Sequence, residues 1–527
     1  MNIRMDRETN IGLIRALEKQ IEEGQGDKIK LKRARNSLLN ISTRVPPEIL
    51  AHIFVWCLFR EPGRSLDSPH FDGLRRGSYN FLLVCHHWFE VASSTPELWN
   101  FWGNSVEDWK KCHHRSGVAP LDLILCGKYN DDNSLDGPLR DALRSRAMQD
   151  TIRQVHMMSG DDDALTSIVA LLTPDDEGGQ NENIESIILL NEGSASLDVS
   201  SFFSRSRLSR LCLLSLVGNI WVSSWDRLAS RATLLTALEL DFSESSFPTP
   251  TTSQLLSILT SNPNIQELGI SHSALPDDTN GSTLKVPLRD LKMLSLSGDF
   301  RHLFELLHRL VLPQALDEMY LCGSNLTVED ISQTLAPYMR EYFRRDARFQ
   351  DKLEIFSSSS LSFISIEVGA VRAQGTARVP WVSFTVTLVA VPPPSVLEQL
   401  FINLIAPFPR VPVVSFTAAL DSKLPEELLF VMPNIETLRI RGMELSKGFL
   451  QPDPDGPRAR TKLLPSLRSL SLENISLNDG NWGHLTTYLG HQTSDGQIIS
   501  LRMFGDLPCI PSEVVDEIKG LVGELVL

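Results

Sequence analysis

Two short clusters of cysteine and histidine contain the residue types best suited to metal binding in this chain. Cys85-His86-His87 and Cys112-His113-His114 could together supply four ligands to zinc, which prefers thiolate sulfur and imidazole nitrogen. No C-x-x-C pair accompanies them, and Cys85 falls among the apolar residues of an expected helix, with His86 and His87 facing outward. We therefore predict no metal site at these clusters.

The sequence likewise contains no recognisable catalytic motif. The carboxylates at 161–163 and 175–177 lie in polar, loop-like sequence, where such clusters are usually solvated. The sequence has no phosphate-binding G-x-x-x-x-G-K-[ST] loop, no G-x-S-x-G and no H-E-x-x-H. Cys57, Cys212 and Cys322 have apolar neighbours and are predicted to be small core residues rather than nucleophiles. We predict that the chain is not an enzyme and needs no cofactor.

Charge and composition limit the partners. A formal net charge of −15 argues against a general binder of nucleic-acid backbones. The most apolar stretch, 379–414, is interrupted by prolines such as Pro393 and Pro407, so no membrane partner is expected. Seven scattered cysteines and a charged N-terminal sequence favour a reducing, cytoplasmic or nuclear location. The basic residues between 28 and 35 are either a nucleic-acid or nuclear-import patch or, as we favour, a solvated face of an amphipathic helix.

The stretch from Arg44 to Trp102 is the densest in large apolar and aromatic side chains. Pro46 and Pro47 suit the first turn of a helix, and apolar residues then recur on one face: Ile49, Leu50, Ile53, Phe54 and Cys57. A second helix is predicted from Phe81 to Ala92, with the following residues inward: Leu82, Val84, Cys85, Trp88 and Phe89. Thr95 is expected to cap a third turn that starts at Pro96 and carries Leu98 and Trp99. So small a domain is expected to dock its excess apolar surface on a partner.

These residues resemble the F-box of large fungal, basidiomycete-type F-box protein families. The resemblance rests on V-P-P-E-I-L-x-x-I-F at 45–54, L-L-V-C-x-x-W at 82–88 and T-P-E-L-W at 95–99. It implies that the module binds a Skp-type adaptor and recruits a cullin-RING ubiquitin ligase, while the rest of the chain selects a protein substrate. The implied adaptor contacts are Pro46, Ile49, Leu50, Ile53 and Phe54, followed by Val84, Cys85 and Trp88. Val45 in place of the usual leucine, and a polar loop at 61–77 in place of the usual short helix, motivate an alternative without adaptor binding.

Beyond Trp109 a phrase of the form apolar-x-x-apolar-x-apolar recurs. Its last two apolar residues point the same way from a short strand, and its first closes the preceding turn. Copies at intervals of about 24 to 30 residues match the period of leucine-rich repeats, and they start at Ile184, Leu211, Leu235, Ile265, Leu291 and Leu316. More widely spaced copies start at Leu397, Ile435, Leu467 and Ile498, and a degenerate copy starts at Ile152.

Helices are predicted between the phrases, at 253–259, 301–310, 328–343, 395–405, 425–431 and 482–489. Residues 360–391 alternate apolar and polar about a Gly/Arg turn, which predicts a β-hairpin. The hairpin is either a projecting insertion or, as we favour, two repeats whose helices have shrunk to loops. A C-terminal capping helix is predicted over 511–527, with its inward residues Val514, Val515, Ile518, Val522 and Leu525.

Together these patterns predict an α/β chain: a helical hairpin at 1–43, an F-box-like domain at 44–115, and an irregular leucine-rich-repeat solenoid, or horseshoe, at 116–527. Outward strand positions carry a mixed charge that suits a protein partner: Glu239, Glu267, Lys292, Glu318, Glu436, Arg439, Arg468 and Glu473. We predict the substrate-recognition subunit of a Skp/cullin/F-box ubiquitin ligase, which holds an unidentified protein substrate near the ligase. The alternative is a leucine-rich-repeat interaction scaffold that does not bind the ligase adaptor.

Overall fold

The computed structural model describes a large part of the chain in two compact units, Met1–Thr233 and Leu234–Leu527. The described residues are 7–24, 27–39, 45–59, 82, 84–102, 114–116, 119–126, 141, 143–144, 149–159, 162–173, 182–193, 196–223, 225–242, 249–271, 285–313, 316–324, 329, 333, 337, 352–358, 363–369, 383–388, 413–418, 435–441, 466–473, 479–493, 500–504 and 511–527.

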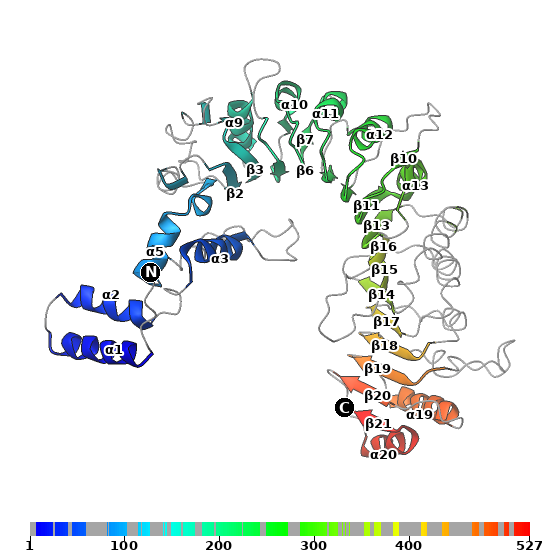
Figure 1. Cartoon of the computed structure of the whole chain (residues 1–527). Helices are drawn as coiled ribbons and strands as arrows, with labels where there is room; N and C mark the ends of the chain where they lie inside the picture. Colours follow the sequence, from blue (N-terminus) through cyan, green and yellow to red (C-terminus); the bar gives the residue numbers. More distant parts are fainter. Residues whose placement is uncertain are drawn as a thin grey trace. The chain divides into compact units, whose positions relative to one another are not determined.

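The first unit begins with a helical hairpin. Helix α1 (Arg7–Glu22) packs on α2 (Lys28–Leu39), as predicted (Figure 1). The turn between them uses Gly24, whose φ of +69° favours glycine, and Asp27, whose Oδ1 accepts the backbone N–H of Ile29 at 3.0 Å. Packing half-buries Leu17 of α1 and Leu31 of α2.

Three short helical elements follow: α3 (Pro47–Phe59), α5 (His86–Ser93) and the 3₁₀ turn η3 (Pro96–Leu98). All three pack on one another. The prediction that the second helix starts at Phe81 is wrong, because Cys85 has an extended backbone (φ −161°, ψ 168°) and the helix begins after it. The predicted loop at 61–77 lies outside the described residues.

Parallel strands form the rest of the first unit. In spatial order they are β1 (Phe101–Trp102), β2 (Leu121–Cys126), β3 (Ile152–Ser159), β4 (Ser186–Asn191) and β6 (Leu213–Gly218). A second parallel pair joins β5 (Leu197–Asp198) to β7 (Ile220–Trp221). Helices α9 (Asp162–Leu172), α10 (Ser200–Arg205) and α11 (Trp225–Arg231) lie along one face of these strands (Figure 1). Asp162 and Asp163, predicted to lie in a loop, instead begin α9.

The repeated phrase has the structural role that its spacing predicts. Val155, Ile187 and Leu214 are register partners on three successive strands, and each is at most 1% exposed. The residues two positions later, Met157, Leu189 and Leu216, form a second row that is at most 2% exposed. Each strand therefore buries its apolar face against its neighbours and the covering helices.

The second unit starts with the same arrangement. Strands β8 (Ala237–Asp241), β9 (Glu267–Ser271), β11 (Met293–Asp299) and β13 (Glu318–Ser324) are parallel and adjacent, and β10 (Val286–Pro287) pairs with β12 (Leu310–Val311). The predicted helices are present as α12 (Thr252–Ser261) and α13 (Phe300–Arg309). A capping box fixes the start of α12, since Thr251 and Gln254 bond each other's backbone N–H.

A three-stranded antiparallel insert then interrupts the parallel order. The spatial sequence is β13, β16 (Ser383–Leu388), β15 (Phe363–Gly369), β14 (Lys352–Ser358) and β17 (Val413–Ala418). Strands β15 and β16 pair antiparallel where the β-hairpin was predicted, but the preference for two shrunken repeats is wrong, because β15 is antiparallel to both neighbours. The insert does not project either. One reversed strand between β14 and β16 lets both of these pair in parallel with the strands outside the insert.

Parallel pairing resumes from β17 through β18 (Thr437–Arg441), β19 (Ser469–Glu473), β20 (Ser500–Phe504) and β21 (Glu524–Val526). Helices α19 (Asp479–Thr493) and α20 (Ser512–Leu521) accompany this part. The predicted C-terminal helix ends early: Val522 is extended (φ −119°, ψ 148°), and the last residues pair with β20 as a strand. The predicted helices at 328–343, 395–405 and 425–431 and the phrase at Leu397 cannot be compared, since they fall largely or wholly outside the described residues.

Candidate functional site

Helix α3 separates its apolar residues into a buried row and an exposed row. Leu50 and Phe54 are each 2% exposed, whereas Ile49 and Ile53 are 54% and 45% exposed. Each pair is spaced i, i+4 and therefore shares a helix face. The buried row packs toward α5, where the rings of Phe54 and Trp88 lie 5.0 Å apart at 59°.

Helix α5 and η3 complete the core of this helical module, which we define as residues 45–99. Trp99 is 3% exposed and its Nε1 donates to the carbonyl of Ala92 at 2.7 Å. The predicted capping role of Thr95 is wrong: its hydroxyl donates instead to the carbonyl of Val91 at 2.7 Å, and no side-chain cap forms at η3. This bond satisfies a carbonyl at the C-terminal end of α5.

The residues implied as adaptor contacts differ in their exposure. Pro46, Ile49, Ile53 and Val84 are exposed, Cys85 and Trp88 are half-buried, and Leu50 and Phe54 are core. Val84 is 54% exposed because it precedes the extended Cys85 and does not belong to the helix, so its predicted inward position is wrong. Phe89 was also predicted inward and is 41% exposed. The module thus presents large apolar side chains to solvent beside the buried Leu50, Phe54, Leu98 and Trp99.

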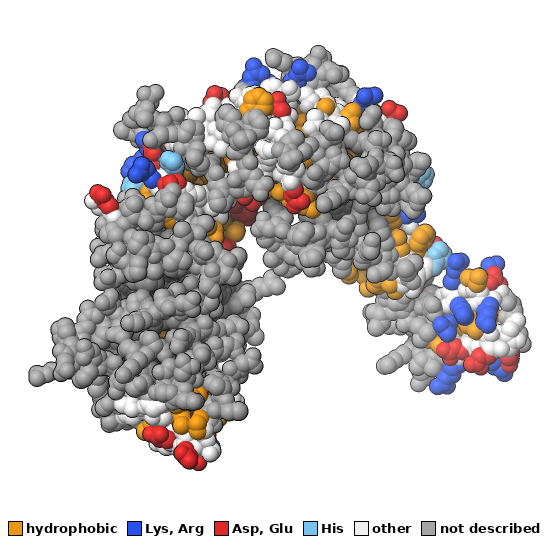
Figure 2. All heavy atoms as spheres, turned by 180° about the vertical axis from the view of Figure 1, so that it is seen from behind, with side chains coloured by type: hydrophobic (Ala, Val, Ile, Leu, Met, Phe, Trp, Pro, Cys, Tyr) orange, Lys and Arg blue, Asp and Glu red, His pale blue; other side chains and the backbone are white. Residues whose placement is uncertain are grey.

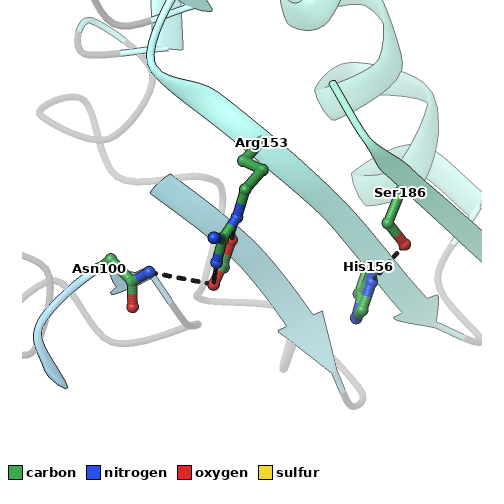
Figure 3. Close-up of polar contacts among 5 residues, drawn as sticks. Asn100, Arg153, His156 and Ser186 are labelled. Carbon is green, nitrogen blue, oxygen red and sulfur yellow. Dashed lines mark hydrogen bonds and ion pairs between the residues drawn. The ribbon is translucent and has the colours of Figure 1, made fainter. Parts of the chain in front are cut away.

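A buried polar cluster joins the end of this module to the first repeat strands (Figure 3). Asp122 on β2 is fully buried and receives two bonds from Arg153 on β3, Nε to Oδ1 at 3.1 Å and Nη2 to Oδ2 at 2.8 Å. Asn100 Nδ2 donates to the same Oδ2 at 3.1 Å, and the Asn100 carbonyl accepts the Asp122 backbone N–H at 2.8 Å. Burial raises the pKa of the Asp122 carboxyl above its ordinary value, while Arg153 opposes the shift.

This cluster was missed from the sequence. The available signal was an aspartate between apolar neighbours in L-D-L-I-L and an arginine in the following strand phrase. A carboxylate with no exposed surface and three side-chain donors has little freedom to bind a substrate. Its contribution is therefore structural: it fixes the chain after η3 to β2 and β3.

The outward face of the first-unit strands is mostly aliphatic. Register places His156 between Ile124 and Ile188, all three half-buried. His156 Nε2 lies 3.0 Å from Ser186 Oγ (Figure 3), and burial lowers the pKa of His156 to about 4. The imidazole is therefore neutral at pH 7 and adds no charge to this face. In the next row, Met158, Leu190 and Val217 are also half-buried.

The outward face in the second unit is charged and polar. One register row contains Glu239, Gly269, Ser295 and Tyr320, and the row before it contains Glu267 and Glu318. Toward the C-terminus Arg502 Nη2 lies 3.9 Å from Glu524 Oε2. All the charged residues predicted at outward positions are exposed or half-exposed, namely Glu239, Glu267, Lys292, Glu318, Glu436, Arg439, Arg468 and Glu473.

Within the described residues no group of three His, Cys, Asp or Glu side chains is arranged to hold a metal ion. Cys85 is half-buried, and Cys112 and His113 lie outside the described residues. No helix in the described part of the chain is both long and apolar enough to span a membrane.

No protein-family model matches the chain, and no curated protein matches it. Among solved structures the chain is similar to one in the crystal structure of the TLR13–ssRNA13 complex, with 12% sequence identity and a TM-score of 0.29. The similarity covers 72% of this chain and 46% of that chain, so this chain spans less than half of its neighbour's length. So low a TM-score does not assign the fold of this chain. The register and burial of the strands themselves define a mixed α/β fold with long parallel sheets, consistent with a leucine-rich-repeat-like solenoid, and the F-box assignment stays a prediction.

Proposed function

We propose that this chain is a protein-interaction scaffold, and more specifically the substrate-recognition subunit of a Skp/cullin/F-box type ubiquitin ligase. In this proposal the helical module docks the Skp-type adaptor and the outward faces of the strands hold a protein substrate. The carrying observation is the exposed apolar surface of the module at Ile49, Ile53, Val84 and Phe89. Large apolar side chains left in water next to one another are typical of a protein-docking surface.

The contribution of these side chains to adaptor binding follows from their exposed fractions. Full burial of an isoleucine contributes about 1.5–3 kcal/mol, so covering the exposed halves of Ile49 and Ile53 contributes roughly 1 kcal/mol each. The remaining apolar side chains add a similar amount. In this proposal the chain performs no chemistry of its own, because bringing the substrate to the ligase raises its local concentration there.

The test is co-purification of the full chain with a recombinant Skp-type adaptor. A variant with Ile49→Glu and Ile53→Glu changes only exposed positions of α3, so its fold is expected to be retained. Val311→Glu is the matched control, since Val311 is 48% exposed and lies in the other unit. We expect the wild type and the control to retain the adaptor and the double variant to lose it.

A folded wild type that fails to retain the adaptor would remove the ligase assignment and leave the interaction scaffold. The charged outward rows of the second unit favour that second candidate, because they offer a binding surface that does not involve the helical module. Charge-reversal at Glu267 and Glu318 would then be expected to weaken capture of a substrate protein, whereas the double variant of α3 would leave it unchanged.

A further inference from the structure

Helix α2 carries a concentration of positive charge that contrasts with the rest of the chain. Its twelve residues include five Lys or Arg and no Asp or Glu, in a protein whose formal net charge is −15. Lys28, Lys30, Lys32 and Arg33 are all exposed, and Figure 2 shows Lys and Arg side chains recurring over the surface of the hairpin. We call these four residues, together with Ile29, the basic face of α2.

The positions of these positive charges destabilise helix α2. Lys28 and Lys30 lie in the first turn, where the helix dipole disfavours cations. Lys28 and Lys32 are spaced i, i+4, which places two like charges side by side. Asp27 offsets part of this by accepting the N–H groups of Ile29 and Lys30 and by lying 3.8 Å from Lys30 Nζ. No ion pair among the described residues involves Lys28, Lys32 or Arg33.

An exposed isoleucine lies among these cations. Ile29 is 63% exposed, the highest value among the large apolar side chains of the described residues. It lies one turn before Arg33 and directly between Lys28 and Lys30 in the sequence. The contact with α1 does not use it, because that contact half-buries Leu31 on another side of the helix.

We propose that the basic face of α2 docks an acidic protein segment that presents an apolar side chain between its carboxylates. Charge complementarity requires an acidic partner, and Ile29 distinguishes a protein from the other anionic surfaces. A phosphate backbone offers no apolar group for Ile29. An anionic membrane would require a broad apolar helix face, whereas Leu31, the leucine of α2 whose side chain is described, is already used against α1. This docking surface is separate from the one assigned to the adaptor.

The test measures binding of the full chain to fluorescein-labelled probes. The first probe is a sixteen-residue peptide of alternating Glu pairs and Leu-Ala pairs, and the second has each leucine replaced by serine. A short duplex DNA and vesicles containing phosphatidylserine are the third and fourth. The variant is Lys28→Gln, Lys32→Gln, Arg33→Gln, since glutamine preserves helix propensity and removes like-charge repulsion. The control, Lys285→Gln, Arg289→Gln, Arg301→Gln, removes the same charge from exposed positions in the second unit that lie outside the outward strand face.

Exposed ion pairs are individually weak, so loss of three positive charges is expected to weaken binding of the leucine peptide about tenfold at low salt. Ile29→Ser and the serine peptide are each expected to weaken it severalfold, and the control should match the wild type. Tighter binding to the DNA or the vesicles than to the leucine peptide, with no effect of Ile29→Ser, would overturn the proposal in favour of a phosphate-bearing partner. Equal binding by the triple variant and the wild type would show that α2 is a solvated face. Circular dichroism of each variant separates these outcomes from unfolding.

Discussion

Replacing Arg153 by methionine tests whether the buried Asp122 carboxylate depends on its ion pair. The substitution removes both guanidinium bonds, at 3.1 and 2.8 Å, and leaves a carboxylate with no exposed surface and, among the described residues, Asn100 alone as a side-chain donor. Breaking a buried pair from one side typically costs about 3–5 kcal/mol. Proton uptake limits the loss: protonating a carboxyl of ordinary pKa 3.9 costs about 4 kcal/mol at pH 7 and about 1.5 kcal/mol at pH 5.

The pKa of Asp122 determines how the stability of the Arg153→Met variant changes with pH. Burial already raises the pKa of Asp122 in the wild type, and Arg153 opposes that shift. Without Arg153 the folded-state pKa rises further above the unfolded value, so the folded variant holds a proton that the unfolded chain releases. The stability of the variant is therefore expected to fall as pH rises from about 4 to its folded-state pKa.

Native-state hydrogen exchange on peptides from β2 and β3 measures this stability locally, which a single unfolding curve of a two-unit chain would not. At pH 7 we expect protection in Arg153→Met to fall about 100- to 1000-fold relative to the wild type, and only about tenfold at pH 5, after correction for intrinsic exchange rates. Adding Asp122→Asn should recover most of the loss. An equal loss at both pH values, or no recovery of protection in the double variant, would refute the charge argument and indicate a packing role for Arg153.

Four further substitutions test the packing of the helical module and of the first-unit strands. Leu50→Ala is expected to destabilise the helical module by about 2–5 kcal/mol and Ile49→Ala by less than about 0.5 kcal/mol, as measured by native-state hydrogen exchange on peptides from α3 and α5. Because the folded-state pKa of His156 is about 4 instead of 6.5, stability is expected to fall by up to about 3 kcal/mol as pH drops from 6.5 to 4; His156→Gln should flatten that dependence in hydrogen exchange at β3. Gly218→Ala is expected to cost more than about 1 kcal/mol, as measured by hydrogen exchange on peptides from β6, because φ is +89° and the new Cβ would collide with the carbonyl of Asn191.

The strand positions could be predicted from sequence because each repeat phrase is local. Two apolar residues spaced by two must share a strand face, and burial of that face follows wherever a neighbour provides the same pattern. Leu238, Leu268 and Leu294 illustrate this: they are register partners and each is at most 2% exposed. By contrast, the alternating pattern at 360–391 predicted the hairpin of β15 and β16, but it could not show that β14 pairs with β15 or that the outer strands of the insert pair with β13 and β17, because those partners are distant in the sequence.

The missed features depend on contacts between distant residues. The pairing of Asp122 with Arg153 spans 31 positions and requires β2 and β3 to be adjacent, which no local pattern specifies. The strand β17 (V-V-S-F-T-A) lacks the repeat phrase and was missed for that reason. At the C-terminus, apolar residues spaced like a helix continue past Leu521, but Gly523 and the edge of β20 favour a strand there.

The split within α3 changes how the F-box-like motif should be used as evidence. Leu50 and Phe54 match the motif, yet their burial means that a charged substitution at either would unfold the module and abolish any interaction indirectly. Ile49 and Ile53 match the same motif and can be changed without opening the core, because about half of each side chain is already in water. Motif residues therefore divide into those that build the domain and those available to a partner. Only the second group can distinguish an adaptor-binding module from a helical domain that merely keeps the sequence pattern.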